Sequence, residues 1–240
     1  NGRPFRVQRE FNANVFKIPT TAIPEKINQF IPYKVSTTNT VNLLMDTLKK
    51  VIGIADLKMP LNAKTIFNMK SDSVFREMLL PSDNFIAEHL LLTYADRLGV
   101  ELNTSKVISH IEKQYLSTLP NKMRWVDGSG LSRGNLFTPR DMITLLELIY
   151  NEVNDQKRLF SLLPAGGKSG TLRNAYPKTD SPFVFGKTGS LSNNHNQSGY
   201  VVTKKGRVLI FSFMNNNFIL PTAEVRAEMV RIMTYIHENF

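Results

Sequence analysis

Apolar residues recur at helical spacing from Thr40 through the middle of the chain. From Thr40 onward they share one face, and Gly53 is placed to end the predicted helix. A short helix is predicted to end at Pro81, and a longer one to begin at Ser82. A further amphipathic pattern predicts a helix over residues 104–117.

Two other stretches have distinct local signals. Residues 1–35 are rich in β-branched and aromatic residues and predict short strands and loops. Thr138-Pro139-Arg140-Asp141 is a favourable helix start, because a capping hydroxyl, a proline at the first helical position and an acid follow one another.

The last third of the chain predicts strands. Phe183–Phe185 leads into a first strand, and Lys204–Gly206 is a plausible hairpin turn between Tyr200–Val202 and Val208–Phe213. An amphipathic helix is predicted after Pro221. The pattern indicates an α+β fold: a helical subdomain plus an antiparallel sheet covered by a C-terminal helix.

Composition narrows the function classes. The 240 residues carry a formal net charge of +10 and no cysteine, so disulfides, thiolate metal sites and cysteine nucleophiles are excluded. No apolar run of about 18 residues predicts a transmembrane segment. The basic residues are scattered, which favours a solvated basic surface over a nucleic-acid site, although an anionic polymer partner stays open. A nucleic-acid partner would be recognised by an affinity for DNA or RNA that depends on salt concentration.

Two short motifs are candidates for chemistry. Ser82-Asp83-Asn84 lies at a predicted helix start, where serine is an ordinary N-cap. Lys187-Thr188-Gly189-Ser190 follows a β-rich run and taken alone is a strand end that turns at the glycine. In this order and context, however, they match two of the three motifs of serine acyl-transfer enzymes that bind penicillin.

Four segments in sequence extend this match. The chain resembles the C-terminal part of the D-alanyl-D-alanine carboxypeptidases of the peptidase S13, penicillin-binding-protein-4-like family, over most of residues 34–240. The matching segments are Pro81–Glu88, Val126–Arg133, Gly167–Arg173 and Lys187–Leu191. The resemblance implies an incomplete penicillin-binding, serine β-lactamase-like fold. Residues 1–34 are then a remnant of an upstream accessory region, and residues 35–240 belong to the DD-peptidase domain.

The family's nucleophile motif, Ser-x-x-Lys, has no match in the chain. Ser73 precedes Arg76 at this spacing, but a guanidinium stays protonated and cannot act as a base. Thr47 precedes Lys50, but both belong to the first predicted helix. The expectation is therefore that the nucleophile lies in a missing N-terminal half, which would be a partner of this chain.

The resemblance also implies roles for the two motifs. Ser82 would relay a proton to the leaving amine, and Asn84 would bind the backbone of the substrate. Lys187 would supply positive potential, and Thr188 would hydrogen-bond the terminal carboxylate of the substrate. Gly189 and Ser190 would line the substrate strand, with the Ser190 N–H forming half of an oxyanion hole.

The implied ligands are peptidoglycan stem peptides and β-lactams, in the periplasm or cell envelope. No cofactor or metal is expected, because the four histidines lack metal-ligand spacing and each is expected to be a surface or helix residue. Lys168-Ser169-Gly170-Thr171 also fits the second motif, but its loop context favours Lys187. Trp125 is expected to be a core residue.

Two alternatives stay open. One is a non-catalytic module that binds cell-wall peptide or has only a structural role, and the other is a β-lactamase-like hydrolase. The Asp127–Arg133 stretch argues against the hydrolase, and its glycines predict a turn with unusual dihedral angles. If the first strands of the sheet belong to a missing half, the strand Val208–Phe213 should show an unpaired apolar edge.

Overall fold

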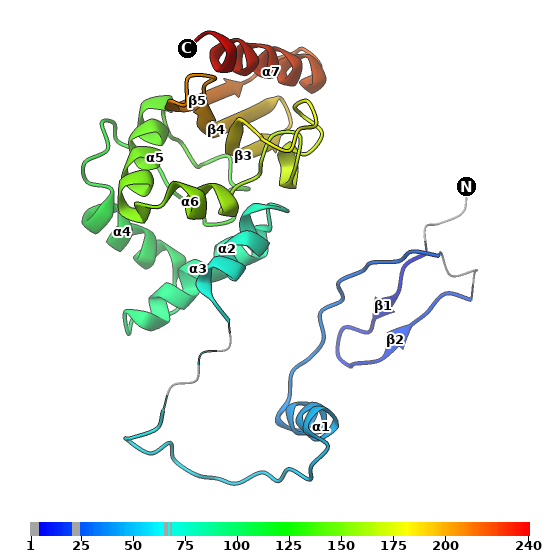
Figure 1. Ribbon diagram of the computed structural model, residues 1–240. Coiled ribbons are helices and arrows are strands. Elements are labelled where there is room, and N and C mark those ends of the chain that lie inside the picture. Colours follow the sequence, from blue (N-terminus) through cyan, green and yellow to red (C-terminus); the bar gives the residue numbers. More distant parts are fainter. Residues whose placement is uncertain (1–4, 21–24, 65–66, 68) are drawn as a thin grey trace. The chain divides into compact units, whose positions relative to one another are not determined.

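The computed structural model describes residues 5–20, 25–64, 67 and 69–240. Contacts divide the chain into two compact units, Asn1–Thr65 and Ile66–Phe240 (Figure 1). Parts of the predicted N-terminal region, residues 1–4 and 21–24, lie outside the described residues. The assignment of residues 1–34 and 35–240 to different domains stays a prediction.

The first unit contains little regular structure. Two short strands, β1 (Gln8–Arg9) and β2 (Phe16–Lys17), pair antiparallel. One helix, α1 (Thr37–Leu48), begins where the Ser36 side chain accepts a hydrogen bond from the Asn39 N–H. The prediction that this helix continues to Gly53 is wrong. Lys49 adopts a left-handed conformation with φ of 53°, and this conformation ends the helix one turn earlier.

The second unit is built on a three-stranded antiparallel sheet. Its strands are β3 (Val184–Leu191), β4 (Asn194–Val202) and β5 (Val208–Asn216), in the order β3-β4-β5. The predicted hairpin is confirmed, since β4 and β5 pair on either side of Lys204–Gly206. Within the described residues β5 pairs only with β4, so its outer edge is open, as expected.

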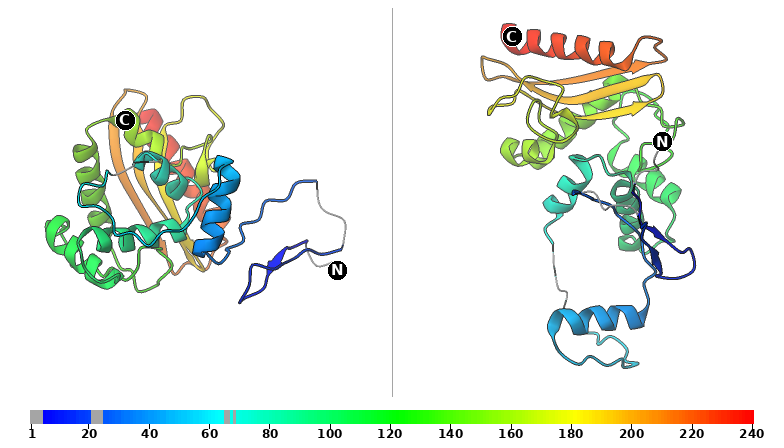
Figure 2. Two further views of the ribbon diagram at one scale, coloured as in Figure 1. Left: turned by 90° about the horizontal axis from the view of Figure 1, so that it is seen from below. Right: turned by 90° about the vertical axis from the view of Figure 1, so that its right-hand side faces the viewer.

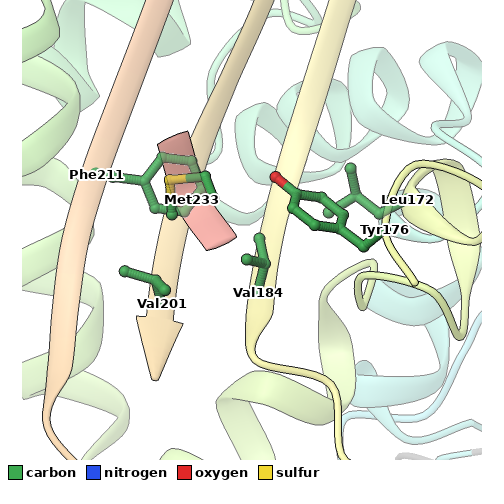
Figure 3. Packing of buried hydrophobic residues seen from close by; sticks show 6 residues of the cluster. All are labelled: Leu172, Tyr176, Val184, Val201, Phe211 and Met233. Atoms are coloured by element: carbon green, nitrogen blue, oxygen red, sulfur yellow. The ribbon is translucent and has the colours of Figure 1, made fainter. Parts of the chain in front are cut away.

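The closing helix α7 (Thr222–Asn239) covers one face of the sheet (Figure 2). Between helix and sheet lies the largest buried cluster, which consists of Leu172, Tyr176, Val184, Val201, Phe211 and Met233 (Figure 3). Met233 and Val184 are fully buried at its centre. The predicted α+β class with a covering C-terminal helix is therefore confirmed.

The remaining helices form the other part of this unit. They are α2 (Ser71–Leu79), α3 (Asn84–Arg97), α4 (Thr104–Tyr115), α5 (Pro139–Val153), α6 (Gln156–Leu162) and the short 3-10 helix η1 (Gly170–Leu172). Helices α3 and α4 pack through one buried cluster, while Phe160 of α6 stacks on Phe185 of the sheet. The sequence pattern did not predict α6. No helix in the described part of the chain is long and apolar enough to cross a membrane.

The start of α5 is fixed by a buried carboxylate. Asp141 is 1% exposed, and its oxygens accept hydrogen bonds from the main chain and side chain of both Asn121 and Thr138. The Thr138 hydroxyl in turn accepts from the Asp141 N–H, which completes a capping box. Burial raises the pKa of Asp141, but these hydrogen bonds outweigh it, so the net shift is downward.

Replacing Asp141 by asparagine is expected to lower the free energy of unfolding by about 2–4 kcal/mol, because an amide NH₂ would face buried donors. A carboxyl group whose pKa is lower in the folded state stabilises the fold at pH values above its unfolded pKa. This stabilisation is lost as the pH falls through the folded pKa. The loss of stability at acid pH should therefore be smaller in D141N. Urea unfolding between pH 7 and pH 3 measures both effects. D155N is the matched control, because the exposed Asp155 caps α6 and asparagine caps equally well.

Candidate active site

The connection between α2 and α3 presents Ser82 in an unusual conformation. Its φ is +63°, in the left-handed region that glycine normally occupies at a helix C-terminus. The Asp83 N–H reaches back to Met78 O at 2.8 Å and closes α2. Asp83, and not Ser82, is the N-cap of α3, since its carboxylate accepts from the Ile86 N–H. The N-cap interpretation of Ser82 is therefore wrong, and its hydroxyl is free for another partner.

The left-handed backbone at Ser82 makes a matched pair of variants informative. S82A removes the hydroxyl and keeps the strain, whereas S82G removes both, so S82G should be more stable than S82A by about 1 kcal/mol. Urea unfolding of the two variants measures the difference. Equal stabilities would show that no backbone strain is stored at this position.

The hydroxyl of Ser82 is bound by the lysine of the second motif. Lys187 Nζ donates to Ser82 Oγ at 2.5 Å and to Thr188 O at 2.7 Å. The two motifs, 105 residues apart in sequence, therefore meet. Burial lowers the pKa of Lys187, and none of the described carboxylates forms a salt bridge with it.

The residues after Lys187 remain in the strand. β3 continues through Ser190 to Leu191, so the prediction of a turn at Gly189 is wrong. Thr188 Oγ1 donates to Thr171 Oγ1 at 2.8 Å, which places the Gly167–Arg173 segment beside the motif. A Cβ at Gly189 would have no described atom within 4 Å.

A loop held by several hydrogen bonds forms another wall of the site. Glu88 of α3 accepts hydrogen bonds from the N–H groups of Gly128 and Ser129 at 2.7 and 3.0 Å. The Asp127 carboxylate accepts from the Gly130 N–H and from two further donors in the loop. Burial raises the pKa of Asp127, but these hydrogen bonds give a net lowering. Gly130 has the predicted unusual dihedral, with φ of +75°.

These elements enclose a cavity of about 1120 Å³. Its lining includes all six candidate residues: Ser82, Asn84, Lys187, Thr188, Gly189 and Ser190. Trp125 also lines it and is only half-buried, so it is not purely a core residue. Lys168 lies elsewhere, with its Nζ bonded to Asp180 O. Asn84 is the first residue of α3.

The prediction for the histidines is wrong at His195. This residue lies in β4, is 3% exposed, and has Nδ1 2.7 Å from Ser190 Oγ. Sequence reasoning missed it because a histidine one strand away from a motif has no characteristic spacing. Thr171 and Glu88 also had no signal of their own. Among the described residues, no three His, Asp or Glu side chains gather as a metal site.

Comparison with known proteins identifies relatives. A model of the D-Ala-D-Ala carboxypeptidase 3 (S13) family matches residues 7–236. Carboxypeptidase DacB of Mycolicibacterium smegmatis is 33% identical over 152 residues, which cover 59% of this chain and 33% of that protein. D-alanyl-D-alanine carboxypeptidase DacB of Haemophilus influenzae is 28% identical over 170 residues, or 68% of this chain and 35% of that one. The chain spans about a third of the length of these curated relatives.

Solved structures agree with this result. Penicillin binding protein 4 (dacB) from Haemophilus influenzae superposes with a TM-score of 0.57 and 25% identity, over 69% of this chain and 39% of that one. An extended spectrum β-lactamase superposes with a TM-score of 0.51 and 18% identity, over 69% and 62%. The second likeness concerns the fold alone, which is that of penicillin-binding proteins and serine β-lactamases.

Proposed function

Because the chain belongs to the D-Ala-D-Ala carboxypeptidase 3 (S13) family, we propose that it forms one side of the active site of a serine-type D-Ala-D-Ala carboxypeptidase. The substrate would be a peptidoglycan stem peptide, and β-lactams would acylate the same site. The observation that carries this proposal is the hydrogen bond from Lys187 to Ser82, which brings two distant motifs together at one cavity.

In this proposal the buried Lys187 ammonium attracts the terminal carboxylate of the peptide. Its bond to Ser82 keeps that hydroxyl in place, where it can accept a proton from one side and pass one to the leaving amine. Thr188 adds a hydrogen bond to the carboxylate. The Ser190 N–H stabilises the developing oxyanion, and the Asn84 amide binds the peptide backbone.

We propose that the nucleophilic serine lies in a Ser-x-x-Lys segment outside this chain. Two observations support this: no serine here has lysine three residues later, and the cavity is large. Its volume of about 1120 Å³ exceeds the usual range of ligand pockets, and Met78, Leu90 and Met142 give it apolar walls. The open edge of β5 would pair with a strand from the same missing part. The enzyme would be exported to the cell envelope, where peptidoglycan lies.

Intact-mass measurement after incubation with benzylpenicillin tests the proposal. The longer polypeptide, which carries both this chain and a Ser-x-x-Lys segment, should gain the mass of one penicillin, whereas the 240-residue chain should gain none. An adduct on the 240-residue chain would make one of its own hydroxyls the nucleophile. Absence of an adduct on the longer polypeptide would contradict the proposed activity.

A further inference from the structure

A buried histidine of β4 contacts the candidate site through Ser190 and has no role in the proposed reaction. Ser190 of β3 and His195 of β4 are direct partners in the antiparallel register. Ser190 Oγ and His195 Nδ1 are 2.7 Å apart, so one of them donates a hydrogen bond to the other. The histidine is 3% exposed, whereas the serine lines the cavity.

The surroundings of His195 favour the neutral ring. Burial, and then the positive charge of Arg226 on α7, lower the pKa of His195. From β5, the uncharged Asn215 amide donates to the main-chain oxygen of His195 at 3.1 Å. No salt bridge between a described acid and His195 compensates a positive ring. A neutral imidazole carries its proton on only one nitrogen, so the tautomer decides which partner donates.

The tautomer determines what Ser190 can offer to a ligand. A hydroxyl has one proton to donate and two lone pairs that accept. If Nδ1 lacks a proton, Ser190 must donate to it and can only accept from a ligand. If Nδ1 carries the proton, His195 donates to Ser190 Oγ, and the Ser190 proton remains available for an anion.

We propose that His195 is a positioning residue which, in its Nδ1–H form, donates to Ser190 Oγ and thereby directs the Ser190 hydroxyl proton toward a bound carboxylate. The inference rests on the proposed function, because that substrate class ends in a carboxylate. It adds a determinant of carboxylate recognition that acts through Ser190 from the neighbouring strand β4.

Histidine-selective nitrogen NMR of the 240-residue chain tests the tautomer. The probe is N-acetyl-D-Ala-D-Ala, and its C-terminal amide is the matched control. Saturation with the acid should give His195 Nδ1 the nitrogen chemical shift of a protonated ring nitrogen. Saturation with the amide should move this chemical shift less. A protonated Nε2 with a bare Nδ1 in the acid complex would overturn the inference.

Affinity measurements test the action through Ser190. H195L should weaken binding of the acid about fivefold to tenfold, because it removes one hydrogen bond to a polar group at the site. H195N should retain most of the affinity for the acid, since the asparagine amide can donate a hydrogen bond from a position similar to that of Nδ1. In an S190A background, H195L should have no further effect.

Equal weakening by H195L with and without Ser190 would show a general packing role and overturn the inference. So would unchanged affinity in H195L. Circular dichroism and urea unfolding of H195L and H195N test whether each variant retains the fold. Failure here is distinguishable from failure of the proposed function, because the latter is decided by the penicillin adduct on the longer polypeptide.

Discussion

Replacing Lys187 by methionine should lower the rate constant for acylation of the longer polypeptide by benzylpenicillin about 100-fold or more. Loss of one preorganised electrostatic group at a reacting centre has effects of this size. The Lys187 ammonium is also the donor that holds Ser82, so methionine removes two contributions at once. Time-resolved intact mass gives the rate constant. Because burial lowers the pKa of Lys187, acylation of the unchanged longer polypeptide should slow at an alkaline pH below the ordinary lysine range.

The chain contains its own control for this experiment. Lys168 begins a second Lys-Ser-Gly-Thr stretch but bonds to Asp180 O away from the cavity lining, so K168M should leave acylation unchanged.

Stability measurements separate a loss of acylation from a loss of folding. A lysine whose folded pKa is lowered destabilises the fold at neutral pH, and this cost declines as pH rises toward the unfolded value. The free energy of unfolding of K187M should therefore be at least as high as that of the unchanged chain. Similar acylation rates for K187M and K168M would contradict the role of Lys187.

Replacing Gly199 by alanine should cost about 3 kcal/mol or more of stability. Gly199 and Gly186 are direct partners in β4 and β3. A Cβ on Gly199 would lie 2.2 Å from Phe185 O and 2.5 Å from Gly186 Cα. Both are backbone atoms of a paired strand, so the clash can be relieved only by separating the strands. Urea unfolding of the 240-residue chain measures the loss.

Gly189 provides the matched control on β3. A Cβ there meets no described atom within 4 Å, so G189A should change the free energy of unfolding by less than about 0.5 kcal/mol. Its methyl group would instead occupy space at the cavity lining. If G199A lowered the free energy of unfolding as little as G189A does, β3 and β4 would have room for a methyl group at Gly199, and the predicted clash would be contradicted.

Local signals predicted much of the fold. The capped start of α5 at Thr138, the hairpin at Lys204–Gly206 and the closing helix after Pro221 each depend on neighbouring residues, and all three are confirmed. The end of α1 was not predictable, because a lysine at position 49 has no intrinsic preference for the left-handed conformation that ends it. The short helix α6 begins at its Asp155 cap, and packing of Leu159 and Phe160 against Tyr200 of the sheet holds it in place.

In the candidate site, too, some residues were predictable from local motifs and others were not. Ser82 and Lys187 belong to motifs, so their residue types and order indicated that they would meet. Glu88 acts through a contact 40 residues away, which no local pattern reveals. His195 lies only five residues after Ser190, but the two meet through the register of the β3–β4 hairpin, which the sequence motif does not specify. The capping role of Asp83 was missed because serine and aspartate are both good N-caps, and only the backbone conformation distinguishes them.

The backbone conformation at Ser82 has an evolutionary consequence. Selection for thermal stability alone should replace this serine by glycine, because glycine fits the left-handed turn between α2 and α3 without a steric penalty. Selection that also requires a working cleft should retain the hydroxyl. A library randomised at position 82, sorted once for folding and once for penicillin labelling of the longer polypeptide, would therefore yield different residues. The difference in enrichment would record how much stability this fold gives up to keep one oxygen atom beside Lys187.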